Sequence, residues 1–225
     1  MNRLIVALDF PTLDEAMAIA RPLADEVGGF KLGLEIMSAA GPAAVETVAE
    51  LGKPVFCDMK LHDIPNTVAG AARRIAAAGA RWVTVHASGG RQMMDAAVSG
   101  MGGAGVLAVT VLTSLNDFDL ESIGIPDGVD TEVFTLANLA QNAGVEGLVC
   151  APGDVAALRH KGIELTIFTP SIRLTPARDD QKRTGTPEEA VAAGADYLVV
   201  GRPVTRAPDP VAAAREITES IDRNR

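Results

Sequence analysis

Residues 55–63 read VFCDMKLHD, and this stretch places two acids and a lysine where a buried strand is expected to end. Side chains alternate between the two faces of a strand, so Asp58 and Lys60 share a face and lie next to each other. Asp63 follows beyond the strand, just before the expected start of a helix. Two carboxylates beside one ammonium hold the lysine protonated and repel an anion placed near Asp58. The group is either a catalytic array or a structural ion pair at the end of a strand.

The same stretch is one of eight strand candidates, which alternate with Ala-rich segments of helical periodicity along the whole chain. The strands are predicted at residues 3–9, 29–34, 54–60, 81–87, 105–112, 147–150, 165–172 and 197–201, and the helices at 12–27, 38–51, 66–78, 90–100, 131–143, 153–160, 187–193 and 210–222. Gly79, Gly144 and Gly194 stand where helices should stop. Eight such units predict an α/β fold, a (β/α)₈ TIM barrel forming a single domain over residues 1–225. A doubly wound open sheet uses the same order of elements and is the alternative.

Composition limits the classes of function. The chain has 225 residues, a formal net charge of -9 and only 4% aromatic residues, so aliphatic side chains must fill its interior. The acidic balance disfavours a nucleic-acid or membrane-surface partner. Cys57 and Cys150 form no CxxC pair and stand in apolar runs, which favours buried thiols in a reducing compartment. No apolar run is long enough to span a bilayer, and a cytoplasmic location is expected.

Polar residues close most of the strand candidates. In a TIM barrel the chemistry lies at the carboxyl ends of the strands, so these side chains converge if the sheet closes. For each of them, a polar residue that merely ends a strand is the alternative, and His86 is expected to be a core histidine. The residues are Asp9, Lys31, Asp58, Lys60, His86, Thr113, Arg173 and Arg202.

The end of the eighth strand candidate predicts a phosphate site. Gly201 lets an anion approach backbone amides, and Arg202 offers a bidentate fork. Arg173 leaves the seventh strand toward the same region, where TIM barrels recurrently bind phosphate. A surface arginine is the alternative for Arg202.

Two connections, residues 113–130 and 174–186, are long and polar, and are either lids or surface loops. No set of His, Cys and acidic residues has convincing metal spacing, and no dinucleotide fingerprint follows the first strand. The sequence therefore predicts chemistry without metal or organic cofactor.

Six segments together resemble the orotidine 5'-monophosphate (OMP) decarboxylase family, and the resemblance covers nearly the whole chain. The segments are residues 5–10 (IVALDF), 30–33 (FKLG), 58–67 (DMKLHDIPNT), 111–114 (VLTS), 179–183 (DDQKR) and 200–203 (VGRP). The resemblance implies that uridine monophosphate (UMP) forms from OMP by loss of carbon dioxide, in a homodimer without a cofactor.

The resemblance also implies residue roles. Lys60 donates the proton to C6, Asp58 sits against the substrate carboxylate, and Lys31 and Asp63 complete the charged array. Asp63 and Thr67 reach into the active site of a neighbouring subunit. The other substrate contacts implied are Asp9 and Lys31 at the ribose hydroxyls, Thr113 at the pyrimidine, and Arg173, Gln181, Gly201 and Arg202 at the phosphate. Ser171 is a departure, because the family commonly has glycine there.

Three other functions compete with this one. Related sugar-phosphate decarboxylases and synthases share the barrel and the DxKxxD motif, but they use magnesium and place an acid where this chain has Lys31. A Schiff-base aldolase could use Lys60, although a lysine held protonated by acids is a poor nucleophile. From a different class, the chain could be a catalytically silent nucleotide-binding barrel.

Overall fold

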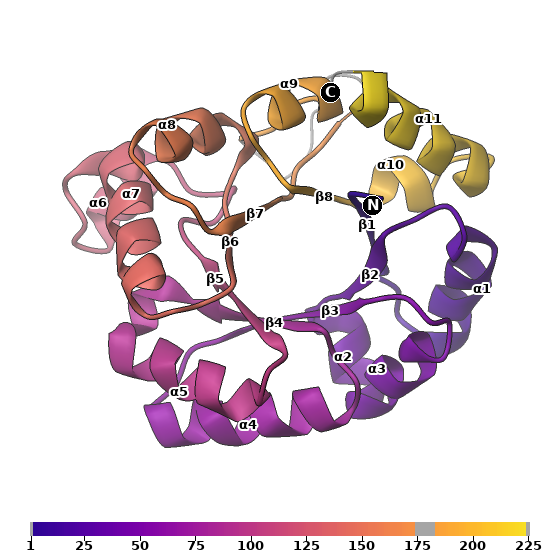
Figure 1. The fold of residues 1–225 in the computed structure, drawn as a ribbon, viewed down its shortest axis with the longest axis horizontal. Coiled ribbons are helices and arrows are strands. Elements are labelled where there is room, and N and C mark those ends of the chain that lie inside the picture. Colours follow the sequence, from indigo (N-terminus) through magenta and orange to yellow (C-terminus); the bar gives the residue numbers. More distant parts are fainter. Residues whose placement is uncertain (1, 174–182, 224–225) are drawn as a thin grey trace.

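Eight parallel strands pair in chain order, and the last pairs back on the first, so that the sheet closes into a barrel (Figure 1). The computed structural model describes residues 2–173 and 183–223. The strands are β1 (Leu4–Ala7), β2 (Gly29–Leu32), β3 (Val55–Leu61), β4 (Trp82–His86), β5 (Gly105–Val109), β6 (Gly147–Val149), β7 (Thr166–Thr169) and β8 (Tyr197–Val200). The predicted closed barrel is confirmed, and the open-sheet alternative is wrong.

Helices surround the barrel (Figure 1). They are α1 (Leu13–Leu23), α2 (Leu34–Ala40), α3 (Pro42–Ala49), α4 (Pro65–Ala77), α5 (Arg91–Met101), α6 (Asp117–Ser122), α7 (Gly128–Asn142), α8 (Val155–His160), α9 (Pro187–Ala192), α10 (Arg202–Thr205) and α11 (Pro210–Arg223), with single 3₁₀ turns η1 (Ala87–Gly89) and η2 (Pro152–Asp154). Gly79, Gly144 and Gly194 end helices with positive φ, as predicted.

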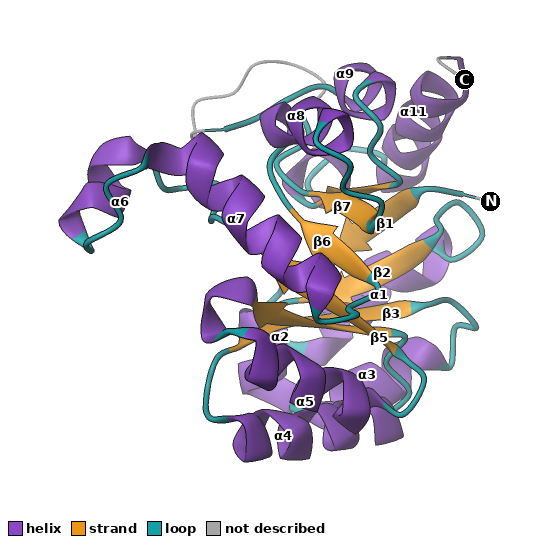
Figure 2. Cartoon of the chain, turned by 60° about the vertical axis from the view of Figure 1, so that its left-hand side comes forward, coloured by secondary structure: helices purple, strands orange, loops and turns teal. Residues whose placement is uncertain are grey.

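Three helical features differ from the prediction. The single helix expected at residues 38–51 is two helices, because Gly41 has a φ of 60° and Pro42 starts a new helix behind it. The polar segment 113–130 contains α6, whose start is fixed by a capping box between Asn116 and Asp119. Helix α6 stands away from the barrel wall in Figure 2. The short α10, directly after β8, was also not predicted.

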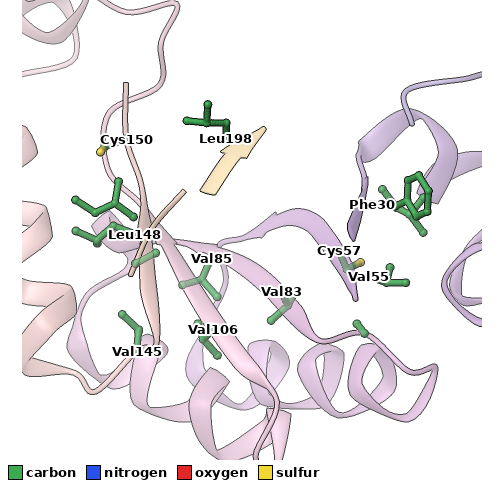
Figure 3. Close-up of a cluster of buried hydrophobic side chains, with 14 of the residues drawn as sticks. Phe30, Val55, Cys57, Val83, Val85, Val106, Val145, Leu148, Cys150 and Leu198 are labelled. Atoms are coloured by element: carbon green, nitrogen blue, oxygen red, sulfur yellow. The ribbon is translucent and has the colours of Figure 1, made fainter. Parts of the chain in front are cut away.

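The barrel separates two apolar layers. Strand residues such as Val55 and Cys57 point outward and pack under the helices, in the large cluster of Figure 3. A smaller cluster fills the barrel itself and consists of Ile5, Ala7, Phe56, Trp82, Leu107, Phe168 and Val199. The rings of Trp82 and Phe168 meet edge to face, with centroids 5.1 Å apart. Because this cluster occupies the barrel interior, polar side chains are left to the carboxyl ends of the strands.

Both cysteines are free and buried, as predicted. Within the described ranges, none of the helices combines the length and apolarity that a bilayer crossing requires.

Candidate active site

A cavity of about 370 Å³ lies at the carboxyl ends of the strands. The predicted site residues that line it are Asp9, Lys31, Asp58, Lys60, Thr113, Arg173, Gly201 and Arg202. They follow or belong to six different strands, and barrel closure brings them together. Such a volume falls in the range of ordinary small-molecule sites.

Four charged side chains form one chain of contacts across the β1–β3 side of the cavity, which we call the charged wall (Asp9, Lys31, Asp58 and Lys60). Lys31 Nζ lies 3.1 Å from Asp9 Oδ1 and 3.5 Å from Asp58 Oδ2. Lys60 Nζ lies 2.9 Å from Asp58 Oδ1. Asp58 is therefore held between two ammonium groups, with the signs alternating along the wall.

Two charges of this wall, those of Asp58 and Lys31, are fixed by their neighbours. Burial raises the pKa of Asp58, but the nearby Lys31 and Lys60 outweigh it and the pKa lies below its ordinary value. Burial likewise lowers the pKa of Lys31, while Asp58 and Asp9 overcome this and raise it. Asp58 is thus a carboxylate and Lys31 an ammonium at neutral pH, although each side chain is little more than one-tenth exposed.

The direction in which the Lys60 side chain points depends on an irregularity in β3. The register between β3 and β4 shifts between Cys57 and Leu61, and Lys60 has a φ of 49°. Its backbone N–H donates to Thr84 Oγ1 at 2.8 Å, and that hydroxyl donates to Asp58 Oδ1 at 2.9 Å. A bulge of this kind redirects a side chain, and here it directs the ammonium onto Asp58.

Two residues of this arrangement were missed from the sequence. Thr84 is fully buried in β4, where the run WVTVH offers a hydroxyl among apolar neighbours as the only signal. Gly33 follows β2, and a Cβ there would come within 2.4 Å of Asp9 Oδ1 and 3.0 Å of Lys31 Nζ. A side chain at this position would therefore displace the ion pair between Asp9 and Lys31.

Another side of the cavity, which we call the β7–β8 wall and which adjoins β1, consists of Pro170, Ser171, Arg173, Gly201 and Arg202. Gly201 has a φ of -107° and a ψ of -106°, and among the described residues a Cβ there would meet only Ala7, at 3.6 Å. Packing against these residues therefore does not explain this glycine. A ligand that approaches its backbone would explain it, and the adjacent Arg202 suits an anion.

Ser171, at the position where glycine is common in the family, has a φ of 63°. This is the left-handed region that glycine enters without strain, and a non-glycine residue there costs roughly 1–2 kcal/mol. Ser171 is buried, and its carbonyl accepts from Gly185 N–H at 3.3 Å. The departure noted in the sequence thus coincides with a strained backbone position.

Other predicted residues are not brought to the cavity in this chain. Asp63 and Thr67 are exposed and do not line it, and Asp63 Oδ1 accepts from Ile64 N–H at 2.7 Å. Gln181, and with it most of the predicted lid at 174–186, lies outside the described residues.

The two neighbouring histidines also lie apart from the cavity. The His86 ring centroid is 5.7 Å from that of His62, and both line a separate cavity of about 170 Å³. Burial, His62 and Lys60 lower the pKa of His86, which is therefore neutral at pH 7. Across the parts of the chain that the structure describes, no cluster of three or more His, Cys, Asp or Glu side chains could hold a metal ion.

Comparison with known proteins agrees with this geometry. A family described as "Orotidine 5'-phosphate decarboxylase / HUMPS family" matches residues 2–217. The chain belongs to this family. Within it, an orotidine 5'-phosphate decarboxylase of Anaeromyxobacter sp. (strain K) is 53% identical over 223 residues, with 98% of each chain covered. One of Novosphingobium aromaticivorans is 46% identical over 222 residues, covering 98% of this chain and 99% of the relative.

A solved structure carries the same family name. The crystal structure of orotidine 5'-phosphate decarboxylase from Lactobacillus acidophilus superimposes with a TM-score of 0.86 at 33% identity, covering 99% of this chain and 100% of the other. The family resemblance drawn from the six sequence segments is confirmed.

Proposed function

We propose that this chain is an orotidine 5'-phosphate decarboxylase, a carbon-carbon lyase that converts OMP to UMP and carbon dioxide in pyrimidine biosynthesis. The observation that carries the proposal is the charged wall, in which Lys60 is aimed into a nucleotide-sized cavity by a bulge and by Asp58. Relatives of this name at up to 53% identity support it.

The reaction breaks the bond between C6 of the pyrimidine and its carboxylate carbon. The electron pair of that bond stays on C6 in the plane of the ring, where the ring delocalises it poorly, so a cation placed beforehand next to C6 stabilises the transition state. In our proposal the Lys60 ammonium supplies this field and then transfers a proton to C6. Lys60 is left neutral and regains its proton from water after carbon dioxide and UMP leave.

Asp58 has two roles in this proposal. As a carboxylate between two lysines, it holds both ammonium groups in place before substrate arrives. In this proposal it also faces the substrate carboxylate, and the repulsion between the two anions is relieved when carbon dioxide departs. Lys31 balances Asp58 from the other side, and we assign Lys31 and Asp9 to the ribose hydroxyls on the strength of the family resemblance.

The β7–β8 wall would bind the far end of the substrate. Arg202 and Arg173 offer guanidinium forks to the phosphate, and Gly201 leaves its backbone accessible. Binding energy from this non-reacting group can be used to hold C6 against Lys60. We assign Thr113 to the pyrimidine and retain Gln181 as a phosphate ligand on the strength of the family resemblance.

We further propose that two copies of the chain form a dimer through the cavity side of the barrel. Large apolar side chains are exposed on segments that follow the carboxyl ends of strands: Leu34, Ile64, Phe118 and Ile123 are 53–76% exposed. Ile64 stands between Asp63 and Thr67, so burying it against a second copy would carry both polar residues toward the partner's cavity. Buried free thiols further support a reducing compartment, which we propose is the cytoplasm.

A spectrophotometric assay of OMP loss tests the activity, and the same assay with chelator present tests the absence of a metal requirement. Full activity in chelator is expected. Activity on a sugar phosphate that depends on magnesium, without activity on OMP, would instead support the related sugar-phosphate enzymes. Sedimentation with Ile64→Asp tests the dimer, since a fully active monomer would contradict the shared site.

A further inference from the structure

Beside the cavity, a buried carboxylate and a guanidinium form a second ion pair that the mechanism above does not use. Arg183 Nη1 lies 2.8 Å from Asp154 Oδ1 and 2.9 Å from Asp154 Oδ2. The side chain of Asp154 is only 8% exposed and that of Arg183 20%. Asp154 was not singled out from the sequence, and Arg183 was quoted only as the last residue of the 179–183 segment, without a role.

This pair ties together loops that follow neighbouring strands. Asp154 Oδ2 accepts from Ala151 N–H at 3.0 Å in the loop after β6. Arg183 Nη2 donates to the carbonyls of Val111 and Leu112, at 2.9 and 3.4 Å, in the loop after β5. A planar guanidinium can serve a carboxylate and two carbonyls at once, which a lysine ammonium on a single stem cannot do in the same plane.

The loop after β7 contacts the segment that begins with Arg183. Arg173 N–H donates to the carbonyl of Gly185 at 2.9 Å, so the segment that starts with Arg183 runs beside the β7–β8 wall. Gly185 itself packs closely on Pro152, because a Cβ there would come within 2.7 Å of the proline Cβ. The guanidinium of Arg183 thus lies where the loops after β5, β6 and β7 meet.

The segment that Arg183 holds is part of the cavity. Val111, Leu112, Thr113 and Ser114 all line it. They follow β5, which lies two strands from β3 of the charged wall and two strands from β7 of the β7–β8 wall. In the proposed function Thr113 contacts the pyrimidine, so this segment faces the base, at the end of the nucleotide away from the phosphate.

We propose that Arg183 is a positioning residue, which fixes the Val111–Ser114 segment against the nucleobase while Asp154 orients its guanidinium. The proposal rests on the proposed function. It predicts that changing Arg183 weakens the binding of ligands that contain the base and spares the binding of the sugar phosphate alone.

The chain contains a matched control pair. Arg159 Nη2 lies 2.7 Å from Asp196 Oδ2, and Arg159 also donates to the carbonyls of Ile163, Leu165 and Gly194 at 2.8–3.1 Å. These carbonyls precede β7 and β8, at the end of the barrel away from the cavity. The two arginines have the same kind of partners, and they differ in whether those partners line the cavity.

The test compares Arg183→Lys with Arg159→Lys by calorimetric titration of UMP and of ribose 5-phosphate. Arg183→Lys is expected to raise the UMP dissociation constant roughly 10- to 100-fold, the loss that follows when a buried polar contact is left unmade. The constant for ribose 5-phosphate should change by less than about twofold, because the phosphate contacts are retained. Arg159→Lys should lower thermal stability and leave both constants unchanged.

If Arg183→Lys is too unstable to titrate, Arg183→Ala with added guanidinium replaces it, and recovery of UMP binding is then expected. Equal weakening of both ligands, or of neither, overturns the proposal. A wild-type protein that binds UMP and fails to decarboxylate OMP overturns the proposed function and leaves the role of Arg183 standing. A wild-type protein that binds neither ligand overturns both.

Discussion

The charged wall and the β7–β8 wall line one cavity, and each contains a non-glycine residue with a positive φ. Within the described ranges these two, Lys60 at 49° and Ser171 at 63°, are the only such residues. Lys60 is held by side-chain chemistry, through Thr84 behind its N–H and Asp58 at its ammonium. Ser171 is held through its backbone by Gly185. The comparison teaches that the positive φ of Lys60 is coupled to side-chain contacts, while the positive φ of Ser171 is coupled to a backbone hydrogen bond.

The largest expected loss of activity comes from removing Lys60, which stands at the end of the charged wall. Lys60→Ala removes both the cation next to C6 and the proton donor, so kcat/KM for OMP should fall by at least roughly 10⁴-fold. Steady-state assays measure this, and UMP titration checks that the cavity still binds ligand. Retention of more than one per cent of wild-type efficiency would contradict the role given to Lys60.

The corresponding alanine substitution on the β7–β8 wall should lower kcat/KM less. Arg202→Ala removes one phosphate contact far from C6, and kcat/KM should fall roughly 100-fold, mostly through KM. Wild type and variant should act equally on orotidine, which lacks the phosphate. A loss comparable to that of Lys60→Ala would erase the difference between the two walls.

A third test uses pH. Because the folded state lowers the pKa of Asp58 below 3.8, its contribution to stability is present above that pH and is lost as the pH falls through the folded value. In Asp58→Asn the free energy of unfolding should therefore fall less steeply as the pH is lowered. The slope against pH should decrease by up to about 1.4 kcal/mol per pH unit. Urea titrations from neutral to acidic pH measure this. An unchanged slope would show that the carboxylate is not stabilised by its lysines.

The smallest effect is expected at Ser171. Ser171→Gly removes the strain of the positive φ and should raise the free energy of unfolding by about 1 kcal/mol, with kcat unchanged. Ser171→Ala keeps the strain while removing the hydroxyl, so chemical denaturation of the two variants separates backbone from side chain. A gain in the alanine variant, or a loss in the glycine variant, would mean that the serine side chain matters more than its backbone.

The sequence predicted those parts of the molecule that depend on periodicity and strand order. Alternation of faces in residues 55–60 placed Phe56 inside the barrel and Cys57 outside, and the pairing of neighbouring strands β2 and β3 brought Lys31 to Asp58. These outcomes follow from local pattern and general barrel geometry. The break between α2 and α3 at Gly41-Pro42 was also predictable, since Gly-Pro marks such helix ends, but a single helix was expected at residues 38–51.

Other features could not be read from pattern. The positive φ of Lys60 comes from pairing with β4, and the roles of Thr84 and Arg183 come from partners 24 to 72 residues away. Asp63 illustrates a different limit. Within one chain it is an exposed residue after β3, and its predicted role depends on a second copy that no local pattern describes.

The aromatic cluster inside the barrel has one more consequence. Trp82 is the only tryptophan of the chain, and it is enclosed by Phe168, Tyr197 and the carboxylate of Glu146, to which its indole N–H donates at 2.7 Å. The protein therefore carries one intrinsic fluorophore, placed inside the closed sheet and below the ligand cavity. Its emission will report opening of the barrel itself and not the fraying of a peripheral helix.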